Sequence, residues 1–145
     1  MKNLSLCYPA KITQDEQGYY VEFIDFDAFS EGDTLEEAIF NAQEALDVTL
    51  LGLVDTNQPV PKPSQRHAKN IYGIAASPEI AVPVMLYQSR KESHKTISDI
   101  AKIMDVSFQR YHDIEKGRNI TLKTLKKAAA AMGATVEIKF NFVQQ

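Results

Sequence analysis

The chain begins with a regular alternation of apolar and polar residues. The apolar positions of this segment are Leu4, Leu6, Tyr8, Ala10 and Ile12. A period of two over this length predicts a half-buried β-strand. Because proline has no N–H to donate, Pro9 places this strand at a sheet edge or turns the Pro9 nitrogen away from a partner strand.

A hairpin and a helix are predicted next. Residues 19–26 are rich in aromatic and β-branched side chains and follow a polar turn at 15–18, which predicts a returning strand. A short third strand is expected at 28–31. Thr34 and Glu37 then have the spacing of a capping box. The helix they open would bury one apolar stripe. Its members are Leu35, Ala38, Ile39, Ala42, Leu46, Leu50 and Leu53.

The middle of the chain predicts a connector, a strand and a helix start that is followed by a proline. Three prolines within residues 57–64 exclude a helix and predict an extended connector. Residues 69–76 are expected to form a fourth strand. Ser77-Pro78 is a plausible helix start, but Pro83 is expected to break or kink any helix there.

Residues 96–117 carry the pattern of two short helices joined by a tight turn. Thr96 with Asp99, and Ser107 with Arg110 at its third position, have the spacing of helix caps. Asp105 lies at the turn, where a left-handed backbone conformation is needed. The inward positions are Ile100, Ala101, Met104, Val106, Tyr111 and Ile114. The outward face of the second helix then consists of Phe108, Gln109, Arg110, His112 and Asp113. A polar face at a helix N-terminus suits reading of the DNA major groove.

A third helix and a terminal strand complete the prediction. Thr121 opens the helix and Gly133 ends it. Its expected inner stripe is Leu122, Leu125, Ala128, Ala129 and Met132. Residues 134–143 alternate again and predict a strand with no obvious partner in its own domain. Such a strand invites pairing across a two-fold axis, so we expect a homodimer, with a higher oligomer left open.

Charge divides the chain into two halves. The net charge is −3 overall, yet residues 1–76 hold 5 Lys/Arg and 12 Asp/Glu, whereas residues 77–145 hold 11 and 7. The halves therefore carry −7 and +4. Residues 90–127 alone carry 10 Lys/Arg and 5 Asp/Glu. This favours a nucleic-acid partner for the second half and a different partner for the first. Ordinary surface variation is the alternative explanation.

Composition narrows the class of protein further. No apolar run approaches the roughly 20 residues of a membrane span, and the first residues do not resemble a signal peptide, so a cytoplasmic protein is expected. One cysteine allows no internal disulfide. Three scattered histidines and that cysteine do not form a zinc ligand set. No metal site, cofactor or catalytic residue is expected.

Four carboxylates near the first helix need separate consideration. They are Asp25, Asp27, Glu31 and Asp33. A two-metal nuclease needs several convergent carboxylates, and this group is close in sequence. A solvated acidic surface is the more economical interpretation, and Asp33 is suitably placed to interact with the helix N-terminus.

The second half resembles the lambda-repressor/Cro-like helix-turn-helix family. The resemblance covers about 40 residues and rests on Thr96, Ile100-Ala101, Val106-Ser107 and Ile114-Glu115-Lys116-Gly117, followed by the spacing of the third helix. Ile97 stands where many members have a phosphate-binding Gln, and Asp105 replaces the usual Gly. The implied base-reading positions are Phe108, Gln109, His112 and Asp113. The DNA-binding set predicted in full is Ser107, Phe108, Gln109, Arg110, His112, Asp113, Lys116 and Arg118.

The first half resembles HicB antitoxins over about 50 residues. The matching features are Tyr19-Tyr20-Val21, an acidic residue at 25, Gly32-Asp33-Thr34, and the Glu-Ala helix that follows. Asp27-Ala28 replaces the usual Pro-Gly. The resemblance implies an incomplete RNase H-like domain that blocks a HicA toxin, a small basic protein that cleaves mRNA, and repression of the shared operon. An acidic half facing a basic partner is consistent with this. The candidate toxin-binding residues are Asp25, Asp27, Glu31 and Asp33.

Taken together, the sequence predicts an α+β protein of two domains. Residues 1–76 would form a partial RNase H-like β-β-β-α-β domain that binds the toxin. Residues 77–145 would form a helix-turn-helix domain with a C-terminal strand that binds operator DNA and dimerises. A ligand-responsive repressor and a metal-dependent nuclease of RNase H type are the alternatives.

Overall fold

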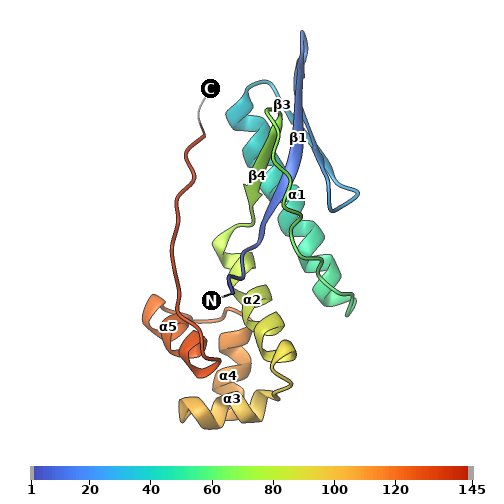
Figure 1. The fold of residues 1–145 in the computed structure, drawn as a ribbon. Coiled ribbons are helices and arrows are strands. Elements are labelled where there is room, and N and C mark those ends of the chain that lie inside the picture. The colour runs from blue at the N-terminus through green and yellow to red at the C-terminus, as the bar shows by residue number, and fades with distance from the viewer. Residues whose placement is uncertain (1, 144–145) are drawn as a thin grey trace. The chain divides into compact units, whose positions relative to one another are not determined.

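The computed structural model of this protein describes residues 2–143. The chain forms two compact units. One includes the described residues up to Pro78 together with those from Asn141 onward, and the other comprises Glu79–Phe140. The first unit holds an antiparallel sheet and one long helix, and shorter helices follow along the chain, as can be traced in Figure 1.

The first unit is built on a four-stranded antiparallel sheet. Its strands are β1 (Cys7–Asp15), β2 (Gly18–Phe23), β3 (Phe29–Gly32) and β4 (Ile71–Ala75), in the spatial order β3-β2-β1-β4. The pairing register places Ile12 opposite Val21 and Tyr8 opposite Ile74, so apolar residues gather on one face. The expected hairpin, the short third strand and the fourth strand are confirmed.

The helix α1 (Leu35–Asp55) lies against that apolar face (Figure 1). Thr34 is its N-cap, and its hydroxyl accepts a hydrogen bond from the Glu37 amide at 3.1 Å. The fully buried part of its inner stripe is Leu35, Ala38, Ala42, Leu46 and Leu50. The approach is close at one point, because a Cβ added to Gly32 would lie 2.4 Å from the Ala38 nitrogen. Only glycine fits there.

One expectation for the sheet is wrong, and the two alternatives for Pro9 are resolved. The second strand ends at Phe23 rather than at residue 26, and residues 24–27 bend. The bend returns the Phe26 ring to the core, where it packs edge-on against Tyr8 with centroids 4.7 Å apart. The strand with Pro9 lies inside the sheet, which leaves the second alternative, a Pro9 nitrogen that faces away from a partner strand. The Pro9 carbonyl accepts a hydrogen bond from the Ile24 amide. Because the nitrogen and the carbonyl of one strand residue point to the same side, the Pro9 nitrogen faces the side where β2 has already ended.

The second unit is a cluster of four helices around one apolar core. These are α2 (Pro78–Glu92), α3 (Ile97–Met104), α4 (Phe108–Glu115) and α5 (Leu122–Ala131). The buried core residues are Leu86, Ile100, Ala101, Tyr111, Ile114 and Ala128. This core takes one or two side chains from every helix, which holds the four helices in a fixed arrangement.

The helix α2 corrects the expectation of a break at Pro83. Pro83 lies inside a continuous helix. It lies in the second turn, where proline removes one hydrogen bond to the carbonyl four residues back. The Pro83 ring lies close to Gly117, which has φ +78°, because a Cβ added there would lie 2.9 Å from the Pro83 Cγ. The ring therefore packs directly against the backbone at Gly117.

One prediction near the C-terminus is wrong, and another concerns a contact between two chains. Leu122 was expected in the inner stripe of α5, yet it is 73% exposed, because it is the first residue of the helix and lies outside the core. Residues 134–143 form no strand within a single chain, and the strand expected from pairing across a two-fold axis stays a prediction. The tail has no neighbouring strand to supply backbone hydrogen bonds, so its alternating side chains remain exposed.

Candidate functional site

The joint between α3 and α4 has the geometry of a helix-turn-helix. Asp105 adopts the left-handed conformation, with φ 56° and ψ 48°, as expected for this turn. The Val106 amide donates to the Ala101 carbonyl at 3.0 Å, which closes the last turn of α3. Both helices then pack through Ile100, Ala101, Tyr111 and Ile114. The turn and the inward positions predicted from the sequence are therefore confirmed.

Side-chain caps fix where each helix begins. Thr96 and Asp99 form a reciprocal capping box, with bonds of 3.1 Å and 2.8 Å. The hydrogen bond from the Thr96 amide lowers the pKa of the Asp99 carboxyl below its usual value. Ser107 accepts from the Arg110 amide at 3.0 Å and starts α4. These caps define the position at which the N-terminus of α4 meets solvent.

The outer face of α4 is where the predicted DNA-binding residues gather. Phe108 is 53% exposed, the Arg118 side chain is 63% exposed, and Gln109 and Lys116 are exposed as well. Arg110, His112 and Asp113 are half-buried. The Ser107 hydroxyl already accepts the hydrogen bond that caps α4. A contact of Ser107 with DNA stays a prediction. The arrangement presents one aromatic ring, one amide and two cations from a single short segment.

Asp113 connects several of these residues. Its Oδ1 accepts from Gln109 Nε2 at 3.0 Å and from Arg118 Nη1 at 3.3 Å. His112 Nδ1 lies 3.8 Å from the same oxygen, and the His112 ring stacks with Phe108. The carboxylate is already engaged by donors of its own unit. Asp113 therefore orients neighbouring side chains on the exposed face.

A buried ion pair behind this face was missed by the sequence analysis. Arg90 of α2 meets Glu115 of α4, with their side chains 12% and 6% exposed. Hydrogen bonding to Glu115 raises the pKa of Arg90. Burial, together with the Glu115 charge, raises the pKa of the adjacent Tyr111. The only sequence signal was a charged residue directly after the inward-facing Ile114, which does not identify its partner.

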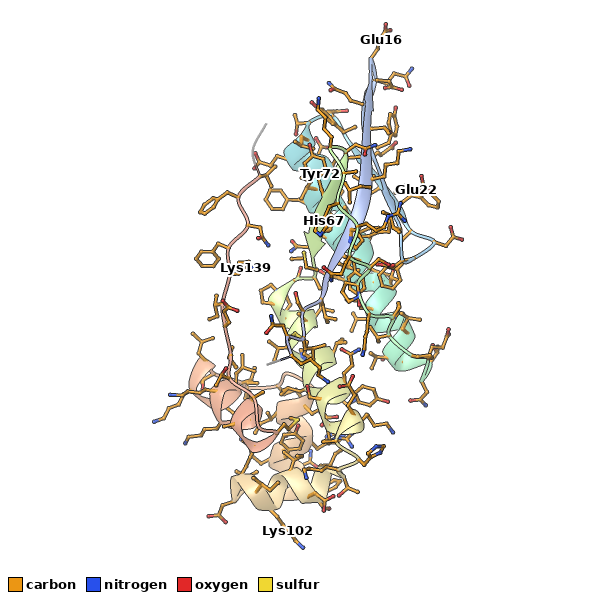
Figure 2. All side chains as sticks on the ribbon, in the orientation of Figure 1. Glu16, Glu22, His67, Tyr72, Lys102 and Lys139 are labelled. Atoms are coloured by element: carbon orange, nitrogen blue, oxygen red, sulfur yellow. The ribbon has the colours of Figure 1, made fainter. Side chains whose placement is uncertain are left out.

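Basic side chains are exposed on α3 and α5, the two helices that contact α4. Lys102 extends away from α3 into solvent (Figure 2). Lys123, Lys126 and Lys127 are exposed on α5. Exposed cations near a polar helix N-terminus suit contact with a phosphate backbone. The charge excess predicted for residues 90–127 thus includes a solvent-facing surface.

The four acidic residues of the first unit do not form one constellation. Asp25 accepts hydrogen bonds from both the backbone amide and the hydroxyl of Ser64, so it fastens the proline-rich connector. Burial raises the pKa of the nearby Tyr8 to about 12, and the Asp25 charge adds to this effect. Asp27, Glu31 and Asp33 are exposed. Within residues 2–143, no three His, Cys, Asp or Glu side chains gather as metal ligands would.

The open face of the sheet carries a shallow hollow. Its volume is about 470 Å³, and its side-chain lining includes Lys11, Tyr20, Glu22, Phe29 and Glu31. Phe29 is 63% exposed there.

No described helix is long and apolar enough to cross a membrane.

Comparison with known proteins identifies two matching regions. Residues 7–75 match the family described as HicB_like antitoxin of bacterial toxin-antitoxin system, and residues 86–138 match the family described as helix-turn-helix. The chain is 29% identical over 133 residues to a protein named Antitoxin HicB 2 from Photorhabdus laumondii, which covers 90% of this chain and 94% of that protein. It is also 38% identical over 58 residues to an uncharacterised 14.9 kDa protein of Haemophilus phage HP1, covering 39% and 44% of the two chains.

Proposed function

We propose that this chain, which carries a HicB-like antitoxin domain followed by a helix-turn-helix domain, neutralises a HicA-like mRNA-cleaving toxin and represses its own operon. The observation that carries the proposal is the order of the two domains. A relative named as an antitoxin aligns with this chain across both of them. The chain would act by binding and not as an enzyme.

The DNA-binding role is assigned to the second unit. The outer face of α4 would enter the major groove, with Phe108, Gln109 and His112 near the base edges. Lys116 and Arg118 would contact phosphates, and Ser107 and Arg110 would lie at the N-terminal end of the same helix. Asp113 is assigned to this site as the residue that positions Gln109 and Arg118. The support is the exposure of this face and the cations around it.

The toxin-binding role is assigned to the first unit. Asp27, Glu31 and Asp33 offer exposed negative charge to a basic protein, and that charge would speed encounter. Asp25 would act indirectly, because Ser64 occupies its carboxylate. The strand and helix order β-β-β-α-β supports a partial RNase H-like arrangement for this domain. The proposed division of labour is residues 1–76 for toxin and residues 77–145 for DNA, in a cytoplasmic protein.

A homodimer is part of the proposal. The tail from residue 134 presents Val136, Ile138, Phe140 and Phe142 at alternate positions, with exposed fractions of 41%, 64%, 83% and 82%. Pairing with the same tail of a second chain would satisfy its backbone groups and cover these side chains. Two copies of α4 could then read the two halves of a palindromic operator.

The experiment requires the expected partner, a small basic protein whose reading frame we expect beside this gene. An RNA-cleavage assay with that protein should show activity that stops when the full chain is added. Fluorescence anisotropy with DNA from upstream of the operon should show specific binding. Persistent RNA cleavage at saturating amounts of the chain would contradict the antitoxin role, and equal affinity for unrelated DNA would contradict specific repression.

A further inference from the structure

The exposed side of α1 carries a regular row of side chains that the fold does not use. The row follows steps of three or four residues, so its members lie one above another on a single helix face. Its members are Glu37, Phe40, Glu44, Val48, Leu51 and Asp55. Carboxylates and large apolar side chains interleave along it, and all six residues are exposed.

The apolar members are too exposed to belong to the core of the first unit. Phe40 is 53% exposed, Val48 72% and Leu51 42%. The opposite side of the same helix already supplies the core through Leu46 and Leu50, which are fully buried. A helix with one buried stripe normally presents a polar outer side. Three large apolar side chains aligned on that side therefore mark a surface for a partner.

The charge of α1 indicates which partner fits. The helix contains five acidic residues and no Lys, Arg or His. If two copies of the row met, carboxylates would face carboxylates in either direction, because Glu44 lies near the middle and Glu37 and Asp55 lie near the ends. Such contacts repel each other. A basic protein with apolar side chains between its cations would complement both features.

We propose that the Glu37–Asp55 row of α1 is the docking surface for the basic toxin. This inference rests on the proposed function and assigns the main contact to α1 rather than to the acidic residues at 25–33. The three apolar side chains would set the affinity, because buried apolar contacts dominate binding free energy. The three carboxylates would set the rate of encounter, an effect that salt weakens.

The test measures binding of the full chain to the basic protein encoded by the adjacent reading frame, by surface plasmon resonance. Phe40→Ser and Val48→Lys should each weaken binding by about 30-fold or more, as expected for residues at the centre of an interface. Val48→Leu is the matched control, because it keeps an apolar side chain on the helix, and it should bind like the wild type. The combination of Glu37→Gln, Glu44→Gln and Asp55→Asn should slow association and flatten its salt dependence.

A second control distinguishes α1 from the open face of the sheet. Phe29 is as exposed as Phe40 and also lies among carboxylates, but on β3. Phe29→Ser should leave binding unchanged. If Phe29→Ser abolishes binding while Val48→Lys does not, the docking surface is the sheet and our inference is wrong. If the wild-type chain does not bind the basic protein at all, the proposed function fails as well. Circular dichroism of each variant verifies that α1 is intact.

Discussion

Arg90 and Glu115 form a two-point ion pair that joins α2 to the end of α4. Arg90 Nε lies 2.8 Å from Glu115 Oε2, and Arg90 Nη2 lies 3.0 Å from Oε1. The remaining Arg90 nitrogen, Nη1, donates to the Lys95 carbonyl at 3.0 Å. The planar guanidinium meets both carboxylate oxygens through two separate nitrogens, a fork geometry that the single ammonium nitrogen of a lysine does not have. The pair therefore fixes the helix that carries the candidate DNA-reading residues.

Removing Glu115 should destabilise the second unit selectively. Glu115→Ala leaves the Arg90 charge buried without its partner, which costs about 3–5 kcal/mol. Hydrogen exchange in the full chain should accelerate at the amides of α3 and α4, while amides of the β-sheet keep their protection. Lys116→Ala is the control, because Lys116 is exposed and adjacent. Unchanged protection in α4 would show that the pair contributes little to stability.

Gln109 and His112 should contribute to sequence-specific DNA binding. Each is on the face of α4 that we assign to the major groove, and a lost base contact costs roughly 1–3 kcal/mol. Gln109→Ala and His112→Ala should therefore weaken binding to the operon DNA in an anisotropy titration. Affinity for random DNA should stay the same. An equal loss on both DNAs would instead mean that these side chains contact only phosphates.

Asp113 should have opposite effects on specific and non-specific binding. Asp113→Ala releases Gln109 and Arg118 from their common acceptor and removes a negative charge. Discrimination between operon and random DNA should fall, while affinity for random DNA should rise. Asp105→Asn is the matched control, because asparagine tolerates the left-handed turn and the change removes one charge while leaving the hydrogen bonds of Gln109 and Arg118 to Asp113 in place. If Asp105→Asn reduces discrimination equally, charge alone explains the effect.

The C-terminal tail should control the oligomeric state. Deleting residues 135–145 removes four exposed apolar side chains that alternate along an extended segment. We expect the truncated chain to be a monomer by light scattering and to lose tight operator binding. A truncated chain that still forms dimers would place the dimer contact elsewhere.

Local signals in the sequence predicted much of the fold. Thr34, Thr96, Ser107 and Thr121 were each expected to open a helix, and each hydroxyl accepts from the amide three residues later. These predictions succeeded because a cap depends on four consecutive residues. The apolar stripe of α1 was also correct, since Ala42, Leu46 and Leu50 are fully buried.

Features that depend on distant contacts were not predictable in this way. The ring of Pro83, inside a continuous α2, packs at Gly117, and Asp25 is occupied because the connector returns Ser64 to it. Periodicity did not reveal that Phe40, Val48 and Leu51 remain uncovered, since an exposed apolar row has the same spacing as a buried one. The Arg90–Glu115 pair likewise joins residues far apart in the sequence.

The contact between Pro83 and Gly117 has a genetic consequence. A methyl group at position 117 would strain a left-handed backbone and press on the proline ring, and both effects are confined to the second unit. Gly117→Ala should therefore be a separation-of-function allele: a reporter fused to the operon promoter would be derepressed, while cells would remain protected from the toxin. Cells poisoned by their own toxin in that background would show that damage to the second unit also disables the first.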